Sequence, residues 1–158
     1  MTRWLSDNEQ RNWRAWLNAS LLLPDRLSRD LAEKHGLTMA DYEILVHLSE
    51  HPEQRLRMSE LAERTLSSRS RLSHQIDRMV KADLVAREAC SDDRRGSFAV
   101  LTDNGWKTIM AAAPDHVMAV REHLVDLLGP ERFAEFGDTC SIIVDDLVER
   151  SGARRVVE

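Results

Sequence analysis

Between Met58 and Thr102 the pattern of the chain changes from two helices to two strands. The run RMSELAERT predicts a short helix, and LSSRSRLSHQIDRMVKADLVARE predicts a turn followed by a second helix. Residues 84–90 and 97–101 are rich in valine and alternate with polar residues, which predicts two strands joined by a charged tip. This order of elements is typical of a winged helix-turn-helix. We therefore expect a mainly α fold with a small β-wing.

The second helix, residues 68–82, has an apolar face and a polar face. Leu72, Ile76, Met79 and Val80 recur at helical spacing and predict the face that packs on the preceding helix. Short hydroxyls and arginine on the other face suit base edges and phosphates. A solvated helix face would show the same periodicity. The candidate DNA-contacting residues of this helix are Ser68, Ser70, Arg71, Ser73, His74 and Arg78.

The predicted hairpin tip, residues 91–96, combines turn residues with arginine. Gly96 suits a tight tip, and arginine suits the negative potential of a narrow minor groove. Asp93 can hold an arginine in place through a charge-assisted hydrogen bond. We therefore add Asp93, Arg94 and Arg95 to the candidate DNA-contacting residues. A solubilising hairpin turn is the alternative interpretation.

The distribution of charge along the chain favours DNA binding more than the net charge does. The chain of 158 residues has a net charge of −5, which by itself argues mildly against a nucleic-acid binder. Residues 55–95 hold ten Lys and Arg against seven Asp and Glu, whereas the rest of the chain holds twelve against twenty. Affinity for DNA depends on local phosphate neutralisation rather than on total charge. The positive excess lies on the segment that would face DNA. The net acidity favours the alternative function, a winged-helix protein-interaction module without specific DNA binding.

Helix starts and stops are marked by capping residues. Thr38 followed by Asp41 predicts one start, and Ser59, a serine of the 66–68 turn and Thr102 predict three more. Residues 7–35 predict a long helix that Pro24 kinks or breaks and Gly36 ends. Pro114 implies a second kink, and Gly129-Pro130-Glu131 a break before the last helix.

Both ends of the chain carry long apolar stripes that need a partner. Packing them together across a two-fold axis would make a homodimer and place two recognition helices one DNA turn apart. The predicted organisation is an N-terminal dimerisation helix (1–36), a winged helix-turn-helix DNA-binding domain (37–105) and C-terminal dimerisation helices (106–158).

Several other classes of protein are disfavoured. No apolar run reaches the length of a membrane span, and the N-terminus lacks a signal-peptide core, so we expect a cytoplasmic protein with no membrane partner. Cys90 and Cys140 suggest neither a disulfide framework nor a thiolate metal site, and His47 with His51 is not a complete metal site. Oxidation of Cys90 near the wing stays a minor alternative. Without a phosphate loop or catalytic motif, we expect no enzyme and no cofactor.

The central segment resembles the multiple-antibiotic-resistance regulator (MarR) family of bacterial transcription factors. The matching residues are Leu61, Ala62, Ser70, Leu72, Asp77, Arg78, Leu84, Val85, Arg87, Asp93, Arg94, Arg95, Gly96, Leu101, Thr102 and Gly105. The resemblance implies an obligate homodimer that binds a short promoter palindrome in duplex DNA, usually as a repressor. It places Ser70, Arg71, Ser73 and His74 in the major groove and Arg95 in the minor groove, with Asp93 and Arg78 orienting or contacting phosphate. His74 departs from the family, since many relatives carry arginine there.

The same resemblance implies regulation by a small aromatic effector. Members of the family often release DNA when an aromatic acid or phenol binds between the dimerisation helices and the winged domain. By layout, the residues expected to line that cleft are Trp13, Trp16, Tyr42, His47, Trp106 and Met110. Aromatic and methionine side chains at helical spacing are also typical of an ordinary core.

Overall fold

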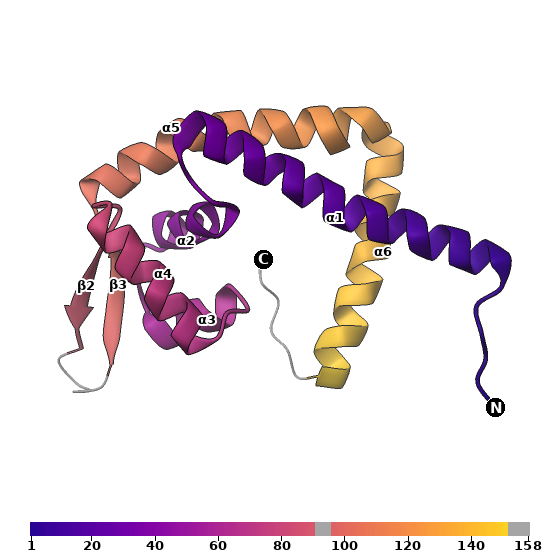
Figure 1. Ribbon diagram of the computed structural model, residues 1–158, viewed down its shortest axis with the longest axis horizontal. Helices are drawn as coiled ribbons and strands as arrows, with labels where there is room; N and C mark the ends of the chain where they lie inside the picture. Colours follow the sequence, from indigo (N-terminus) through magenta and orange to yellow (C-terminus); the bar gives the residue numbers. More distant parts are fainter. Residues whose placement is uncertain (91–95, 152–158) are drawn as a thin grey trace.

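The computed structural model describes residues 1–90 and 96–151, and it is mostly helical with one small antiparallel sheet (Figure 1). The predicted winged helix-turn-helix is confirmed, with long helices that extend away from it. The elements in chain order are α1 (Asp7–His35), α2 (Met39–Glu50), β1 (Arg55–Arg57), α3 (Met58–Arg64), α4 (Arg69–Lys81), β2 (Val85–Ala89), β3 (Ser97–Leu101), α5 (Asp103–Val120), the π-helical turn η1 (Arg121–Val125) and α6 (Asp126–Ser151).

Three of the four predicted helix caps are present. Thr38 and Asp41 form a capping box at the start of α2. The Ser68 hydroxyl accepts from the backbone N–H of Arg71, and Thr102 caps α5. The prediction for Ser59 is wrong, because α3 already begins at Met58 and has no side-chain cap. Strand β1 pairs with β3 up to Arg57 and leads directly into α3, so strand pairing sets where this helix starts.

The prolines do not divide the long helices. Helix α1 continues through Pro24 and α5 through Pro114, which excludes the break considered at Pro24. Gly36 takes a left-handed conformation with φ of 66° and ends α1 as predicted. The predicted break at Gly129 is also confirmed, because its φ of 75° and ψ of 167° interrupt the helical backbone inside α6.

The core of the winged domain lies between α2, α3, α4, the sheet and the first half of α5. Strand β3 is central, in the order β1-β3-β2, and both of its neighbours run antiparallel to it. The largest fully buried side chains are Leu31, Ile44, Leu45, Leu48, Leu56, Leu61, Leu72, Ile76, Met79 and Val85. The expectation that Val80 packs inward is wrong. Val80 is 39% exposed because it lies beside the buried face of α4 that Leu72, Ile76 and Met79 form, not on that face.

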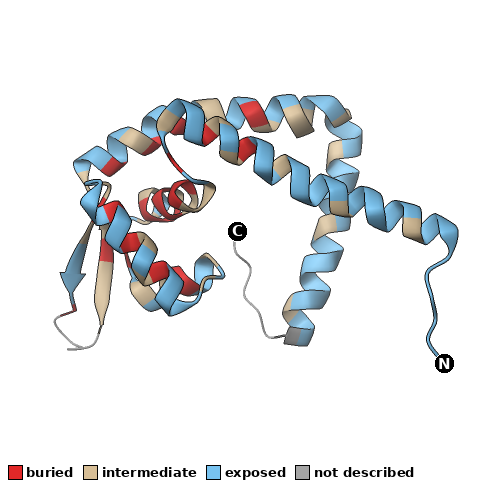
Figure 2. Ribbon diagram, in the orientation of Figure 1, coloured by how far each residue is buried: buried red, intermediate tan, exposed pale blue. Residues whose placement is uncertain are grey.

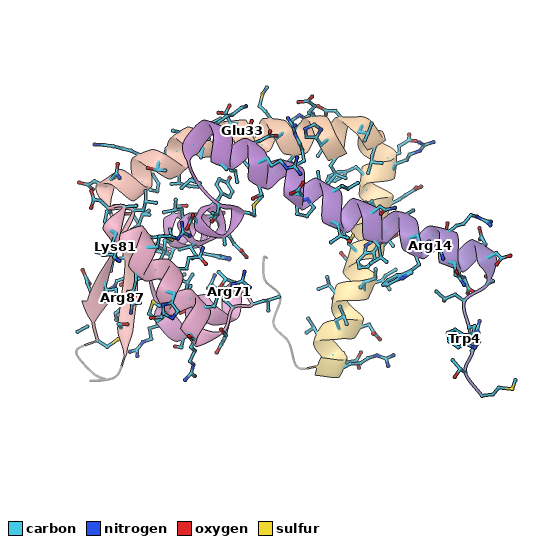
Figure 3. All side chains as sticks on the ribbon, viewed as in Figure 1. Trp4, Arg14, Glu33, Arg71, Lys81 and Arg87 are labelled. Carbon is cyan, nitrogen blue, oxygen red and sulfur yellow. The ribbon has the colours of Figure 1, made fainter. Side chains whose placement is uncertain are left out.

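Residues 7–22 and 117–151, here called the helical arm, differ from this domain. Figure 2 shows the buried positions gathered in the winged domain and along the α1–α5 contact, while α6 is largely exposed. Large exposed apolar residues of the arm are Trp13, Trp16, Leu21, Leu22, Val117, Met118, Leu127, Phe136, Ile142, Ile143, Val144 and Leu147. Trp4 lies on the extended segment before α1, far from the winged domain (Figure 3). Within the described residues, no helix is both long and apolar enough to cross a membrane.

Candidate nucleic-acid interface

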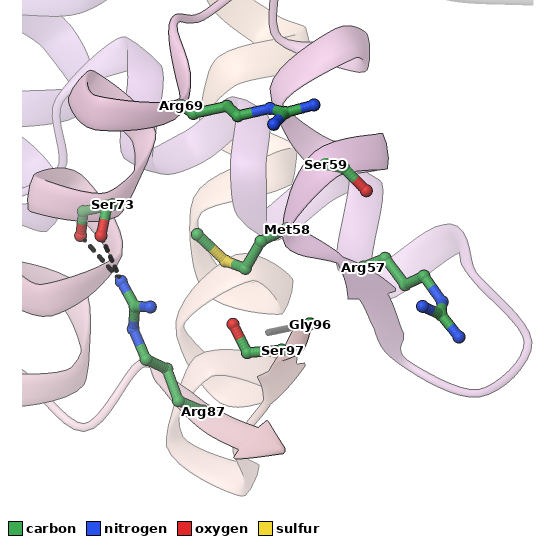
Figure 4. A pocket seen from close by; sticks show the side chains of 8 residues that line it. All are labelled: Arg57, Met58, Ser59, Arg69, Ser73, Arg87, Gly96 and Ser97. Atoms are coloured by element: carbon green, nitrogen blue, oxygen red, sulfur yellow. Dashed lines mark hydrogen bonds between the residues drawn. The ribbon is translucent and has the colours of Figure 1, made fainter. Parts of the chain in front are cut away.

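A groove of about 400 Å³ lies between the two helices of the helix-turn-helix and the wing (Figure 4). Three arginines line it, Arg57, Arg69 and Arg87, and each comes from a different element. Its remaining lining consists of Met58, Ser59, Ser73, Gly96 and Ser97. Cationic and hydroxyl groups around an open groove of this size suit a negatively charged, hydrogen-bonding chain such as a nucleic-acid backbone.

Two of the arginines that line this groove have no partnering carboxylate in the described part of the chain. Among the described residues, neither Arg57 nor Arg69 forms an ion pair. The Cζ atom of Arg57 lies 5.3 Å from the centroid of the Phe98 ring, and Arg55 lies over the same ring at 4.8 Å. This cation–π contact holds Arg57 at the base of the wing while leaving its N–H donors available.

The outer face of α4 is available for contact. Ser70, Arg71 and His74 are exposed and form no side-chain hydrogen bond or ion pair within the described part of the chain. The Ser68 hydroxyl accepts the N–H of Arg71 at 3.2 Å. Ser68 therefore caps α4, and its hydroxyl hydrogen can still be donated to another acceptor.

Ser73 and Arg78, both predicted to contact DNA, already have intramolecular partners. The Ser73 hydroxyl accepts from Arg87 Nη2 at 2.9 Å, and Arg87 also pairs with Asp77 at 3.0 Å. Arg78 binds Asp41 through both terminal nitrogens, with Nη2 2.7 Å from Oδ1 and Nη1 3.1 Å from Oδ2. Of the two roles that we expected for Arg78, this geometry matches orientation of α4.

Asp41 is a buried anchor between α2 and α4. Its side chain is only 3% exposed and accepts hydrogen bonds from the backbone N–H and hydroxyl of Thr38 as well as from Arg78. Burial opposes ionisation of Asp41, but the hydrogen bonds from Thr38 and Arg78 outweigh it and lower the pKa of the carboxyl. The recognition helix is thereby tied to the start of α2.

The predicted tip residues Asp93, Arg94 and Arg95 lie outside the described residues. Conversely, sequence reasoning missed Arg57 and Arg69 as candidates. Each stands at an element boundary, one at the end of β1 and one in the first position of α4. In the sequence, the only sign of a DNA contact at these two positions was a basic residue beside a helix start, which is weak evidence. The two side chains reach one groove only because α3 packs against α4 and the sheet.

Comparison with known proteins identifies the family. A sequence model of the MarR family matches residues 35–96. The crystal structure of AbsC, a MarR family transcriptional regulator from Streptomyces coelicolor, is 52% identical and superposes with a TM-score of 0.88, covering 94% of this chain and 100% of AbsC. The chain belongs to the MarR family of transcriptional regulators.

Two further relatives of this MarR-family chain are informative. Sco3205, another MarR family regulator from Streptomyces coelicolor, was crystallised in complex with DNA. It is 43% identical with a TM-score of 0.88, over 92% of each chain. The HTH-type regulator MhqR of Bacillus subtilis (strain 168) is 26% identical over 101 residues, which span 62% of this chain and 66% of MhqR.

The six residues expected to line an effector cleft are dispersed in this MarR-family chain. Trp13 and Trp16 stack on each other in the helical arm, with ring centroids 5.0 Å apart. Tyr42 and His47 are buried in α2, and Trp106 and Met110 are exposed on α5. A single chain therefore does not assemble these six side chains around one cavity.

A small cavity does lie where the C-terminal half of α1 packs on α5, and none of those six residues lines it. Its volume is about 10 Å³, which accommodates roughly one water molecule. His35 Nε2 lies 2.9 Å from Asp115 Oδ2 at its edge. The ring centroid of the neighbouring His116 lies 4.4 Å from that of Tyr42 at a tilt of 42°, and burial lowers the pKa of the His116 imidazole. The cavity in this conformation is too small for an aromatic acid.

Other candidate chemistry is absent from the described residues. No three His, Cys, Asp or Glu side chains converge there as metal ligands. His47 is a core residue, and burial lowers the pKa of its imidazole, with Arg64 acting in the same direction. Cys90 is buried at the end of β2, so its thiol is shielded from oxidants.

Proposed function

We propose that this chain is a homodimeric transcriptional regulator, a repressor, that binds palindromic promoter DNA. The observation that carries the proposal is the arginine-lined groove next to the exposed face of α4. In this arrangement α4 enters the major groove, Arg71 and His74 meet base edges, and Arg57 and Arg69 contact the phosphates of one strand. The wing reaches the neighbouring minor groove with Arg95.

The DNA complex of Sco3205 supports this assignment, since that regulator is 43% identical over almost the whole chain. The proposal also gives the helical arm a role. Two copies joined through residues 7–22 and 117–151 would present two α4 helices to successive turns of one palindrome. Residues 37–105 would then form the DNA-binding unit between dimerisation segments at 1–36 and 106–158.

Regulation by a small aromatic effector is part of the same proposal. Trp13, Trp16, Trp106 and Met110 leave apolar surface exposed on the helices that would meet in the dimer. Because the α1–α5 cavity holds about one water, an effector must either bind between two chains or open this junction. Either route would change the separation of the two α4 helices and so release DNA.

Titration of a labelled duplex tests the proposed function. The full chain is added to its own upstream intergenic duplex at two salt concentrations, with random duplex as competitor and fluorescence anisotropy as the readout. We expect tight, competitor-resistant binding that weakens steeply with salt, because phosphate contacts release counterions. Weak binding that is equal for both duplexes would overturn specific DNA binding and favour a protein-interaction module. Phenolic acids are then screened for release of the specific complex.

A further inference from the structure

Arg87 joins the wing to the recognition helix at three acceptors. Its Nη2 atom donates to the Ser73 carbonyl at 3.0 Å and to the Ser73 hydroxyl at 2.9 Å, and it lies 3.0 Å from Asp77 Oδ1. Ser73 and Asp77 are four residues apart and therefore share one face of α4. Figure 4 shows the Arg87 side chain reaching from its strand across to Ser73.

The position of β2 makes this link important. β2 is an edge strand, bonded to β3 alone in the described sheet, and Arg87, Glu88 and Ala89 leave the core after Val85. Because these three residues are exposed, they contribute little buried apolar contact with α4. The Arg87 side chain, which is 33% exposed and has three acceptors, is therefore the main polar contact between β2 and α4 in the described chain.

We propose that Arg87 is a positioning residue that sets the distance between α4 and the wing, and that it does not itself bind DNA. The proposal rests on the proposed function. DNA binding through two elements at once gains affinity when their separation is fixed before the encounter, since less conformational entropy is lost. Arg87 would supply that fixed separation, with Asp77 and Ser73 as its partners.

The rival role for Arg87 is a phosphate contact, because its side chain also lines the groove. The two roles predict opposite effects on DNA affinity when the Asp77 carboxylate is removed. If Arg87 binds phosphate, the Asp77 carboxylate competes with DNA, and Asp77→Asn should strengthen binding by removing a negative charge. If Arg87 is a positioning residue, Asp77→Asn should weaken binding although it makes the surface less acidic.

The experiment compares wild type, Arg87→Ala, Asp77→Asn and the double variant on the specific duplex over a range of salt concentrations. We expect each single variant to bind at least about tenfold more weakly, with an unchanged salt slope, and the double variant to bind no more weakly than Arg87→Ala. Asp83→Asn is the matched control, since it removes an exposed carboxylate beyond the end of α4 and should leave affinity unchanged. Equal or tighter binding by Asp77→Asn would overturn the proposal, as would a salt slope lowered by about one in Arg87→Ala.

A measurement without DNA separates this proposal from the proposed function. Hydrogen exchange of the free protein should show faster exchange in β2 and β3 for Arg87→Ala and Asp77→Asn, with α2 and α5 unchanged. If hydrogen exchange in the wing were unaltered, the positioning role of Arg87 would be overturned, even if the protein binds its operator. If wild type binds no specific duplex, the proposed function fails, and the exchange data still report whether Arg87 holds the wing.

Discussion

The winged domain and the helical arm use apolar residues in opposite ways. In the winged domain, leucine, isoleucine and methionine from four helices and the sheet are almost fully buried within one chain. In the arm, residues of the same kind are exposed along α1 and α6. Exposed apolar surface of this extent is typical of an interaction site. This difference supports our proposal that one chain carries the DNA-reading surface, whereas the arm is completed by a second copy.

Polar contacts show the same contrast. The winged domain has long-range links such as Asp41 with Arg78 and Arg87 with Asp77. Two ion pairs of α6 and η1 are local, Arg150 with Asp146 and Arg121 with Asp126. Local pairs stabilise a helix but do not fix its direction. We propose that packing against a second copy of the chain sets the orientation of α6.

The largest effect is expected from a charge in the arm. Ile143→Asp on α6 should raise the dimer dissociation constant at least about a hundredfold, since an unpaired buried charge costs about 3–5 kcal/mol. Sedimentation velocity measures the change, and circular dichroism should show the winged domain still folded. Ser141→Asp, which adds the same charge at a polar position of the same helix, is the control. A dimer unaffected by Ile143→Asp would remove α6 from the interface.

Replacing one glycine in the winged domain and one in the arm by alanine should change stability in opposite directions. A Cβ at Gly105 would lie 2.0 Å from the Leu84 carbonyl oxygen, so Gly105→Ala should destabilise the fold by about 3 kcal/mol. At Gly137 in α6 a Cβ meets no neighbour within 4 Å in the described chain, and Gly137→Ala should stabilise the helix by up to about 1 kcal/mol. Thermal unfolding measures both changes. Destabilisation by Gly137→Ala would show that the partner packs closely against this position.

The Asp41 anchor should make stability depend on pH. Asp41→Asn should cost about 1–3 kcal/mol of unfolding free energy at neutral pH, because it weakens the hydrogen bonds with Arg78 and Thr38. Because the folded state lowers the pKa of Asp41, its contribution is fully present above the unfolded-state pKa and is lost as pH falls through the folded value. The difference between wild type and variant in urea denaturation should therefore shrink in acid. A difference independent of pH would contradict the assigned ionic role.

The smallest effects distinguish base contacts from phosphate contacts. Arg71→Ala should lower discrimination by at least about 1 kcal/mol at one base pair of each half-site. Arg57→Ala should instead weaken all sequences alike and lower the salt slope by about one. Anisotropy titrations against single-base variants of the operator measure both effects. Uniform weakening by Arg71→Ala would make Arg71 a phosphate contact.

Local sequence signals predicted the fold better than the site. Helix periodicity and caps gave the bounds of α1 and α4 to within a residue, because capping and turn chemistry act over a few positions. The pairing of Arg78 with Asp41 spans 37 residues and could not be foreseen from local spacing. Arg57 and Arg69 were missed for the same reason. The roles of Ser70, Arg71, His74 and the wing tip stay predictions.

The most direct test of the contrast between the two regions is sedimentation velocity of the purified full chain at micromolar concentration, alone and with its upstream duplex. We expect a species of twice the 18.1 kDa chain mass that binds one duplex as two copies. A folded species of one chain mass, with the arm exposed and the duplex bound by single copies, would contradict it.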